Sequence, residues 1–219
     1  MRADLHIHSV HSGDADQTVR DIIVRAKELG LGAIAVTDHN SLRGALEAMD
    51  LAEEILILPG VEVTSSEGHL LAYNVIEEIP RDLSPGETID RIHDLGGIAV
   101  APHPYRIWSG LGEKVVKENR FDAIETMNGR SLPSANRKAG ELARSLKVPE
   151  VGGSDAHQLD SVGSCYTVFP EECLSPNDLV DMIVGRRTEA GGNGRPFLSS
   201  VGYAAKCIGA WMGRGMKRL

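Results

Sequence analysis

The chain has 219 residues, of which 42% are hydrophobic and 25% charged, and its formal net charge is −8 at pH 7. Length and composition indicate one soluble α/β domain, and the acidity argues against a general affinity for nucleic acid. The charge is uneven, because no Asp or Glu follows Glu189, whereas Arg195, Lys206, Arg214, Lys217 and Arg218 do. We therefore expect no stable nucleic-acid binding apart from a contact made by this basic C-terminus.

The three cysteines, Cys165, Cys173 and Cys207, lack the short paired spacing of disulfide frameworks and thiolate zinc sites. We expect them to be reduced, which indicates a cytoplasmic protein. Asp4 and His6 lie where the apolar region of a signal peptide would be, and no apolar run is long enough to cross a bilayer. We therefore expect neither secretion nor a membrane partner.

The first predicted element is a strand over residues 4–9, and a helix follows at 18–30, where apolar residues recur at helical spacing. Short apolar runs then alternate with helical segments, which is typical of a parallel sheet covered by helices. The further predicted strands are 32–37, 55–58, 61–63, 69–75, 97–101, 123–126 and 150–152. The further predicted helices are 44–54, 84–95, 134–146 and 175–186.

Seven or eight strands favour a closed barrel over an open doubly wound sheet, because the glycine-rich phosphate loop of the open sheet is not found. Residues 1–190 are expected to form this barrel. An apolar stripe among basic residues predicts a final amphipathic helix, so that residues 191–219 form an extension packed on the same domain. Contact of this helix with RNA, a membrane surface or another subunit is the alternative.

Two histidines of the first strand, His6 and His8, point to the same face, because successive side chains of a strand alternate. Leu5 and Ile7 supply the apolar face. Other possible metal ligands recur at the ends of later strands, where α/β barrels place their active sites. These residues are Asp38, His39, Glu62, His69, His103, Asp155 and His157.

Imidazole and carboxylate ligands without thiolate suit Mn²⁺, Fe²⁺ and Zn²⁺ in hydrolytic sites. One ion needs only three or four protein ligands, so this supply of candidates predicts two or three ions. Carboxylates can bridge two ions about 3.5–4 Å apart, and a water between such ions can ionise near neutral pH and attack phosphorus or carbon.

Six short motifs occur in one chain in the order DLHIHS, TDHN, PGVEVTS, EGHLLAY, APHP and GGSDAH. They span residues 4–157 and resemble the motifs of the PHP (polymerase and histidinol phosphatase) superfamily. The resemblance implies a stand-alone PHP domain with a distorted (β/α)7, TIM-like barrel. It also implies a two- or three-metal centre at the C-terminal face of the strands that hydrolyses phosphoesters.

The resemblance further implies three sets of metal ligands, position by position. The first ion is matched by His6, His8, Glu62 and Asp155, the second by Glu62, His69 and His103, and the third by Asp14, His39 and His157.

Three residues near these sets have other assignments. Some family members carry His at the position of Asp14, so an aspartate would hold the third ion more loosely or prefer Mg²⁺ or Mn²⁺, and Asp16 is the alternative ligand. Asp38 is expected to orient His39 or to cap the end of its strand rather than to bind metal. His93 lies in a predicted helix among ordinary apolar residues and is expected to be structural or on the surface.

Two arginines, Arg106 and Arg130, follow predicted strands on the same face. Either guanidinium group could clamp a phosphoryl group through two parallel hydrogen bonds, and a solvent-exposed loop charge is the alternative. Catalysis is expected to depend on Glu62, Asp155, His157, Arg106 and Arg130.

The leading interpretation is a metal-dependent phosphoesterase that hydrolyses a small phosphorylated metabolite or a nucleotide phosphate by a metal-bridging hydroxide. Its cofactors would be two to three Zn, Mn or Fe ions, and its partner a small phosphoester. Two alternatives stay open: an amidohydrolase-type hydrolase of amides or esters, and a non-catalytic metal-binding PHP module. The sequence does not indicate an oligomeric state.

Overall fold

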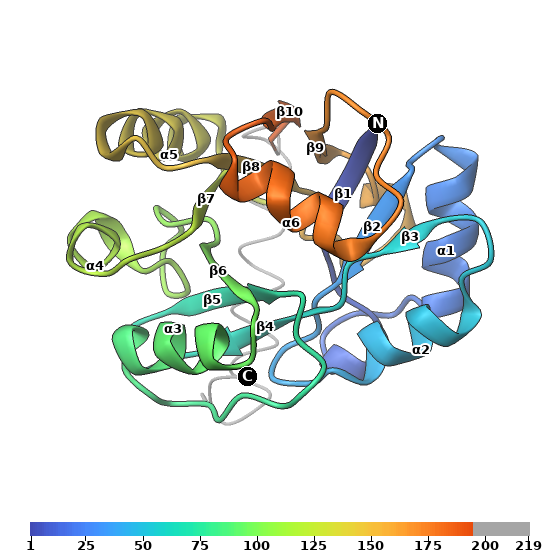
Figure 1. Ribbon diagram of the computed structural model, residues 1–219, viewed down its shortest axis with the longest axis horizontal. Coiled ribbons are helices and arrows are strands. Elements are labelled where there is room, and N and C mark those ends of the chain that lie inside the picture. Colours follow the sequence, from blue (N-terminus) through green and yellow to red (C-terminus); the bar gives the residue numbers. More distant parts are fainter. Residues whose placement is uncertain (195–219) are drawn as a thin grey trace.

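The computed structural model describes residues 1–194, and this part of the chain contains ten strands and six α-helices (Figure 1). The strands are β1 (Arg2–Ile7), β2 (Ala33–Val36), β3 (Leu56–Ile57), β4 (Gly60–Thr64), β5 (His69–Tyr73), β6 (Ile98–Ala101), β7 (Ala123–Asn128), β8 (Glu150–Gly153), β9 (Cys165–Val168) and β10 (Glu189–Gly192). The helices are α1 (Val19–Glu28), α2 (Arg43–Leu51), α3 (Pro85–Asp94), α4 (Gly112–Glu118), α5 (Pro133–Leu146) and α6 (Pro176–Val184).

The strands form two five-stranded sheets of mixed direction, in the orders β10-β9-β1-β2-β3 and β4-β5-β6-β7-β8. The expectation of a parallel sheet is therefore wrong for part of the fold. Strands β4 and β5 pair antiparallel because only residues 65–68 connect them, too few for a helical crossover. The pairs β5–β6, β1–β9 and β9–β10 are also antiparallel.

Two isolated β-bridges join the backbones of the two sheets. One bridge joins Ile7 to Ala156, and the other joins His39 to Glu62. Within residues 1–194 these bridges take the place of the continuous closed sheet that we expected. At the first bridge, β9 pairs with Arg2 and Ala3 at the start of β1. The chain after β8 pairs with the end of β1 around Ile7, where the Asp155 amide donates to the His6 carbonyl.

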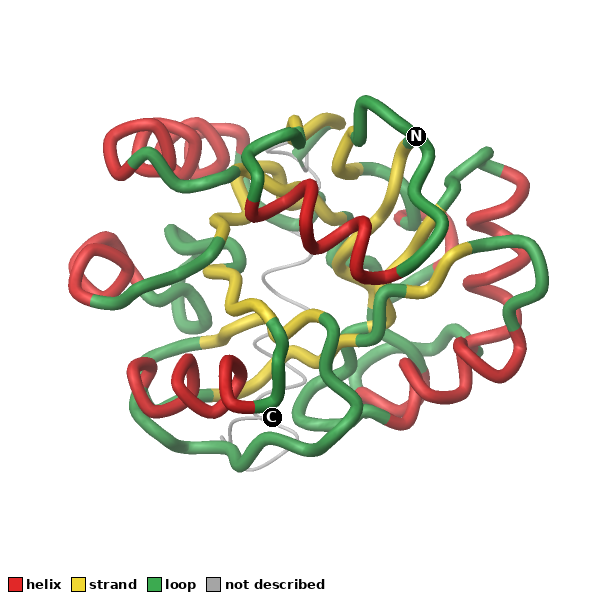
Figure 2. Tube along the Cα trace, viewed as in Figure 1, coloured by secondary structure: helices red, strands yellow, loops and turns green. Residues whose placement is uncertain are grey.

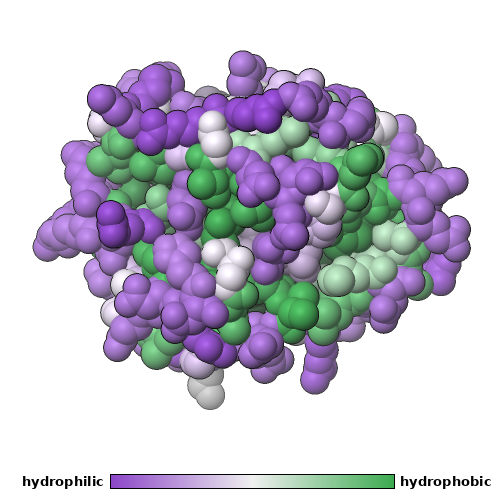
Figure 3. Space-filling model, viewed as in Figure 1, coloured by the Kyte–Doolittle hydropathy of each residue, from purple (hydrophilic) through white to green (hydrophobic). Residues whose placement is uncertain are grey.

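The helices lie outside the strands (Figure 2). Helix α1 begins at the cap residue Thr18 and buries Val19, Ile22 and Ala26, which is the apolar stripe seen in the sequence. In Figure 3 hydrophilic side chains cover much of the surface, and hydrophobic residues show between them. Most of the hydrophobic side chains of the described residues are nevertheless buried.

Helix α6 packs against the cluster that fills the space between the strands. Leu179 and Ile183 of this helix join Leu5, Leu71 and Val100 in one buried cluster. The chain just before α6 is tied to the start of β1, because the Phe169 amide donates to the carbonyl of Met1. The helix therefore lies near the beginning of β1, away from the end that carries His6 and His8.

Most predicted elements correspond to observed ones, whereas α4, β9 and β10 were not predicted. The predicted final amphipathic helix lies outside the described residues, and the division at residue 190 stays a prediction. Among the described residues, no helix is both long and apolar enough to cross a membrane.

Candidate metal centre

The nine residues that the sequence proposed as ligands lie together where β1, β2, β6 and β8 end and where the β4–β5 hairpin passes. Seven of them come from a strand end or the loop that follows it, whereas Glu62 lies within β4 and His69 begins β5. The nine residues are His6, His8, Asp14, His39, Glu62, His69, His103, Asp155 and His157.

The β1 histidines form one side of this centre. The Nε2 atoms of His6 and His8 are 3.1 Å apart, and both side chains are fully buried. The alternation of the strand places the two rings on one side and Ile7 on the other, in the core. The Nδ1 atom of His8 lies 3.0 Å from the Ser12 hydroxyl, which helps to fix the ring.

Glu62 lies in the middle, with each carboxylate oxygen facing different histidines. Its Oε1 is 2.8 Å from Nδ1 of His69 and 3.0 Å from Nε2 of His103. Its Oε2 is 3.1 Å from Nε2 of His8 and 3.2 Å from Nδ1 of His39. A carboxylate whose two oxygens face separate groups of imidazoles has the arrangement needed to bridge two ions.

The third set lies on the less deeply buried side of the centre, where its three side chains are 8–17% exposed. Asp14 Oδ2 is 2.9 Å from Nε2 of His157 and 3.8 Å from Nε2 of His39. Asp16 is exposed and belongs to none of the potential ligand groups among the described residues. The geometry therefore favours Asp14 over Asp16.

The donor atoms fit divalent metal ions. Four groups have ligand atoms within 4.8 Å of one another: His8, Asp14, His39 and His157; His6, Glu62 and His103; His6, His8 and Asp155; and His39, Glu62 and His69. Three buried atoms of the candidate ligands, Oδ1 of Asp14, Nδ1 of His39 and Nδ1 of His103, have no hydrogen-bond partner. Nδ1 of His39 nevertheless lies 3.2 Å from Glu62 Oε2. Contact without hydrogen-bond geometry suits donors that converge on an ion, and an ion would offset the ~1–3 kcal/mol cost of such buried groups.

Burial and neighbouring charges shift the pKa values in this centre. Burial and then the charge of Arg106 lower the pKa of His103 to about 4, and burial with the charge of His8 lowers that of His157 to about 4. Both imidazoles are therefore neutral near pH 7, as metal ligation requires. Burial would lower the pKa of His8, but hydrogen bonds to Asp155 and Glu62 outweigh it and raise the pKa to about 9. Carboxylates that favour a proton on His8 also favour a metal cation there.

Both arginines singled out in the sequence contact Asp155. Nη2 of Arg106 is 2.6 Å from Asp155 Oδ2, and Nη1 of Arg130 is 3.1 Å from Asp155 Oδ1. Burial would raise the pKa of Asp155, but these two guanidinium groups hold it well below its usual range. Arg130 also lies 2.6 Å from Nε2 of His157. Both cations thus face the metal centre, whereas their role toward a phosphoryl group stays a prediction.

A residue that the sequence analysis missed, Glu125 of β7, links three parts of the centre. Its Oε1 lies 2.9 Å from Nδ1 of His6. Its Oε2 accepts hydrogen bonds from the backbone N–H of His103 and the side-chain amide of Asn128, both at 2.9 Å. The carboxylate is buried and fixes the ring that presents Nε2 of His6 to Glu62. A single acidic residue within an otherwise apolar strand start was the available signal.

Asp38 does not contact the ring of His39, so the first of its two expected roles is wrong. Its oxygens accept hydrogen bonds from the backbone N–H and the hydroxyl of Ser9, at 2.6 and 2.7 Å. Consecutive side chains near the end of a strand point in opposite directions, which separates Asp38 from the ring of His39. Asp38 instead fastens the loop after β1 to the end of β2.

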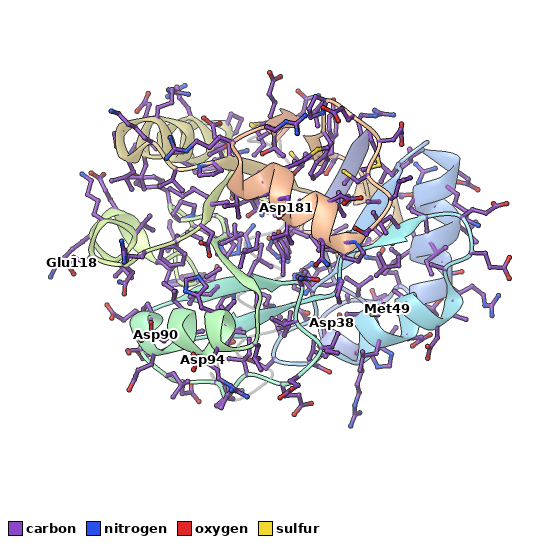
Figure 4. The ribbon with its side chains drawn as sticks, in the orientation of Figure 1. Asp38, Met49, Asp90, Asp94, Glu118 and Asp181 are labelled. Carbon is purple, nitrogen blue, oxygen red and sulfur yellow. The ribbon has the colours of Figure 1, made fainter. Side chains whose placement is uncertain are left out.

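The buried and the exposed acidic residues differ in position. Figure 4 shows Asp90 and Asp94 on α3, Glu118 on α4 and Asp181 on α6, whereas Asp38 lies outside the helices. The four helix residues are exposed and Asp38 is fully buried. The negative net charge therefore belongs in part to the solvated helix surface and does not by itself describe the site.

Comparison with known proteins identifies the family. The PHP domain model matches residues 4–100 and the PHP-associated model matches residues 133–188. An uncharacterised protein of Methanocaldococcus jannaschii is 38% identical over 141 residues, which cover 58% of this chain and 82% of that protein. The chain belongs to the PHP family, as its six motifs predicted.

Solved structures share the fold at low sequence identity. A two-domain protein of Bacteroides vulgatus, which contains a predicted PHP-like metal-dependent phosphoesterase, superimposes with a TM-score of 0.74 at 21% identity, covering 88% of this chain. This chain spans 65% of that protein's length. An amidohydrolase of Chromobacterium violaceum has a TM-score of 0.67 at 19% identity, covering 86% of this chain and 98% of that one.

Proposed function

We propose that this chain is a metal-dependent phosphoesterase that hydrolyses a small phosphorylated metabolite or a nucleotide phosphate. The observation that carries the proposal is the position of Asp155, a ligand candidate whose two oxygens lie beside Arg106 and Arg130. Two guanidinium groups next to a metal centre suit a substrate with several negatively charged oxygens. The four potential ligand groups support a requirement for two to three divalent ions.

The position of each residue in the centre suggests its role in the proposed reaction. When bound, the ions would supply charge neutralisation at the phosphoryl oxygens and a water made more acidic. Glu62 would hold two ions together, while Glu125 keeps His6 and the backbone of His103 in place. Arg106 and Arg130 would leave Asp155 in part and pair with the phosphoryl oxygens, which orients the ester and stabilises the charge that develops on it.

Amide or ester hydrolysis is the second candidate, because the chain shares its fold with an amidohydrolase. Arg106 and Arg130 favour the phosphoester, since a neutral amide offers no anionic oxygens for two guanidinium groups. A non-catalytic module is the third candidate. The presence of all nine ligand-type side chains in one centre argues against it.

A substrate panel separates the candidates. Protein loaded with Mn²⁺ or Zn²⁺ is assayed on an aryl phosphate, on nucleotides with 3′, 5′ and cyclic phosphates, on sugar phosphates and on N-acyl amino acids. We expect turnover of phosphates only. Turnover of amides alone would overturn the proposal, and no turnover of any substrate by fully loaded protein would favour the non-catalytic module.

Elemental analysis tests the cofactor part of the proposal. Protein purified without chelator should contain two to three divalent ions per chain, because the candidates form four groups, two of which share Glu62. Active protein with one ion or fewer would contradict a centre in which ions share a carboxylate.

A further inference from the structure

Two large hydrophobic side chains stand exposed beside the metal centre. Ile107 and Trp108, in the loop between β6 and α4, have relative exposures of 76% and 78%. Trp108 also has a φ of 76°, a left-handed conformation that is uncommon for a residue with a large side chain. An exposed tryptophan in a disfavoured conformation calls for a functional reason.

The loop that carries them is held in place by hydrogen bonds. The Arg106 amide donates to the carbonyl of His103, and the Gly110 amide donates to the carbonyl of Arg106. At the base of the loop the Gly112 amide donates to the carbonyl of Pro104. The hydroxyl of Tyr105 donates to Glu113 at 3.0 Å. The two apolar side chains are therefore presented by an ordered turn.

Two residues close to Trp108 in the loop, Arg106 and Ser109, contact candidate ligands. Two residues before it, Arg106 reaches Asp155 through Nη2 at 2.6 Å. One residue after it, the carbonyl of Ser109 accepts a hydrogen bond from the His69 amide at 3.0 Å. Because two residues span at most about 7 Å, the backbone of Trp108 lies at the rim of the centre.

We propose that Trp108, with Ile107 beside it, is a platform on which a planar ring of the substrate stacks while the phosphoester lies at the metal centre. The inference rests on the proposed phosphoesterase function and adds a specificity-determining residue to it. An indole offers a flat face to a planar group, and such stacking needs no hydrogen-bond match. Arg106 in the same loop would hold the phosphoryl end of the same molecule.

The size of the exposed pair favours a substrate over a protein partner. Aromatic side chains bury only ~150–250 Å² each, so two side chains fall well short of the ~800 Å² that each partner contributes to a stable protein interface. A single ring, by contrast, is covered by one indole and one neighbouring aliphatic side chain.

The test compares two phosphate esters of ribose, one with a planar nucleobase and one without it. Adenosine 5′-monophosphate and ribose 5-phosphate carry the same 5′-phosphoester with and without a base, and kcat/KM is measured for both with Mn²⁺-loaded protein. We expect Trp108→Ala to lower kcat/KM for the nucleotide roughly five- to a hundredfold, the range of base–aromatic stacking, and to change that for ribose 5-phosphate by less than twofold. Trp108→Phe should retain most of the nucleotide rate.

Leu174→Ala is the matched control, because Leu174 is 89% exposed and follows β9, whose last residue pairs with Arg2 at the start of β1. It should affect neither ester. Equal losses for both esters in Trp108→Ala would overturn the platform, as would equal rates for both esters in the unaltered protein. A change of sedimentation coefficient in Trp108→Ala, without a selective loss, would show a contact between copies instead.

Calorimetric titration of the same loaded protein separates this inference from the proposed function. If neither ester is hydrolysed but the nucleotide binds more tightly and Trp108→Ala removes the difference, the platform stands and the hydrolysis of these esters fails. If other phosphates are hydrolysed and the base makes no difference to rate or Kd, the phosphoesterase stands and the platform is wrong.

Discussion

Two histidine–carboxylate pairs of this protein have nearly the same length and opposite surroundings. His6 and Glu125 are 2.9 Å apart with side-chain exposures of 0% and 1%, whereas His93 and Asp122 are 2.7 Å apart with exposures of 40% and 25%. Exposed pairs contribute about 0–1 kcal/mol to stability, while losing one partner of a buried ion pair costs about 3–5 kcal/mol. The distance between the two charged groups therefore does not determine their contribution to stability, which also depends on the local dielectric constant.

The two carboxylates also differ in what they join. Asp122 accepts a further hydrogen bond from the amide of Ala99, which is a local tie between neighbouring strands. Glu125 joins a ring of β1, the backbone after β6 and Asn128. The buried pair can therefore transmit a change to the metal centre, and the exposed pair cannot.

The largest loss of activity is expected for Glu62, whose carboxylate is surrounded by the buried histidines. Glu62→Gln keeps the volume but removes the charge between the histidine groups, so that two ions are no longer held together. Activity should fall by about two to three orders of magnitude, with less metal per chain by elemental analysis. A variant that retains more than a tenth of the rate would exclude a bridging role.

The arginines come next, because they contact the centre without being ligand candidates. Truncation of Arg130 or Arg106 to Ala should leave the metal content unchanged and lower kcat/KM for phosphates about ten- to a hundredfold, since each charge-assisted hydrogen bond contributes roughly 1.5–3 kcal/mol. Replacement of either arginine by Lys should restore only part of the lost kcat/KM, because an ammonium group cannot donate the two parallel hydrogen bonds of a guanidinium group. Phosphate turnover that neither truncation impairs would remove both residues from the mechanism.

Glu125→Gln alters the buried pair itself. An amide at this position can accept at one atom only, so its NH₂ group faces either the ring of His6 or the two donors on the other side. Metal affinity, measured by competition with a chelator, should weaken about tenfold or more. Thermal unfolding of the loaded variant serves as the control, and an unchanged affinity in a folded variant would show that Glu125 does not position His6.

His93→Gln is the matched change in the exposed pair and should have the smallest effect. Thermal denaturation should reveal a loss of no more than about 1 kcal/mol, and metal content and activity should equal those of the unaltered protein. A clear loss of metal in this variant would mean that α3 influences the centre in a way that its contacts do not indicate.

The convergence of the nine candidate ligands was largely foreseeable because its signals are local. Strand alternation alone places His6 and His8 on one face, and the six motifs identify the family. Glu125 was missed because its importance arises from strands that neighbour β7 only in the folded chain. The assignment of Asp38 to His39 was wrong for the opposite reason, since adjacency in sequence places the two side chains on opposite sides of the chain.

The sheet arrangement was less accessible from the sequence. Residues 65–68 leave no room for a helix between two predicted strands, and this hairpin signal contradicted the assumed alternation of strands and helices. The pairing of β9 with β1 could not be foreseen, because it connects residues more than 160 positions apart, such as Ala3 and Thr167. Which strand pairs with the edge of β1 depends on competition among several strands in the folded chain, and no local sequence pattern specifies the outcome.

The two single bridges between the sheets have a mechanical consequence. Residues His6 and His8 flank Ile7 in one bridge, Asp155 and His157 flank Ala156 opposite it, and the other bridge is formed by His39 and Glu62 themselves. An ion held by these side chains would cross-link the two sheets at each bridge. The number of bound ions would therefore determine how cooperatively the two sheets separate. In chelator-treated protein, amide hydrogen exchange should accelerate first at residues 62 and 155, whose N–H groups donate across the junctions.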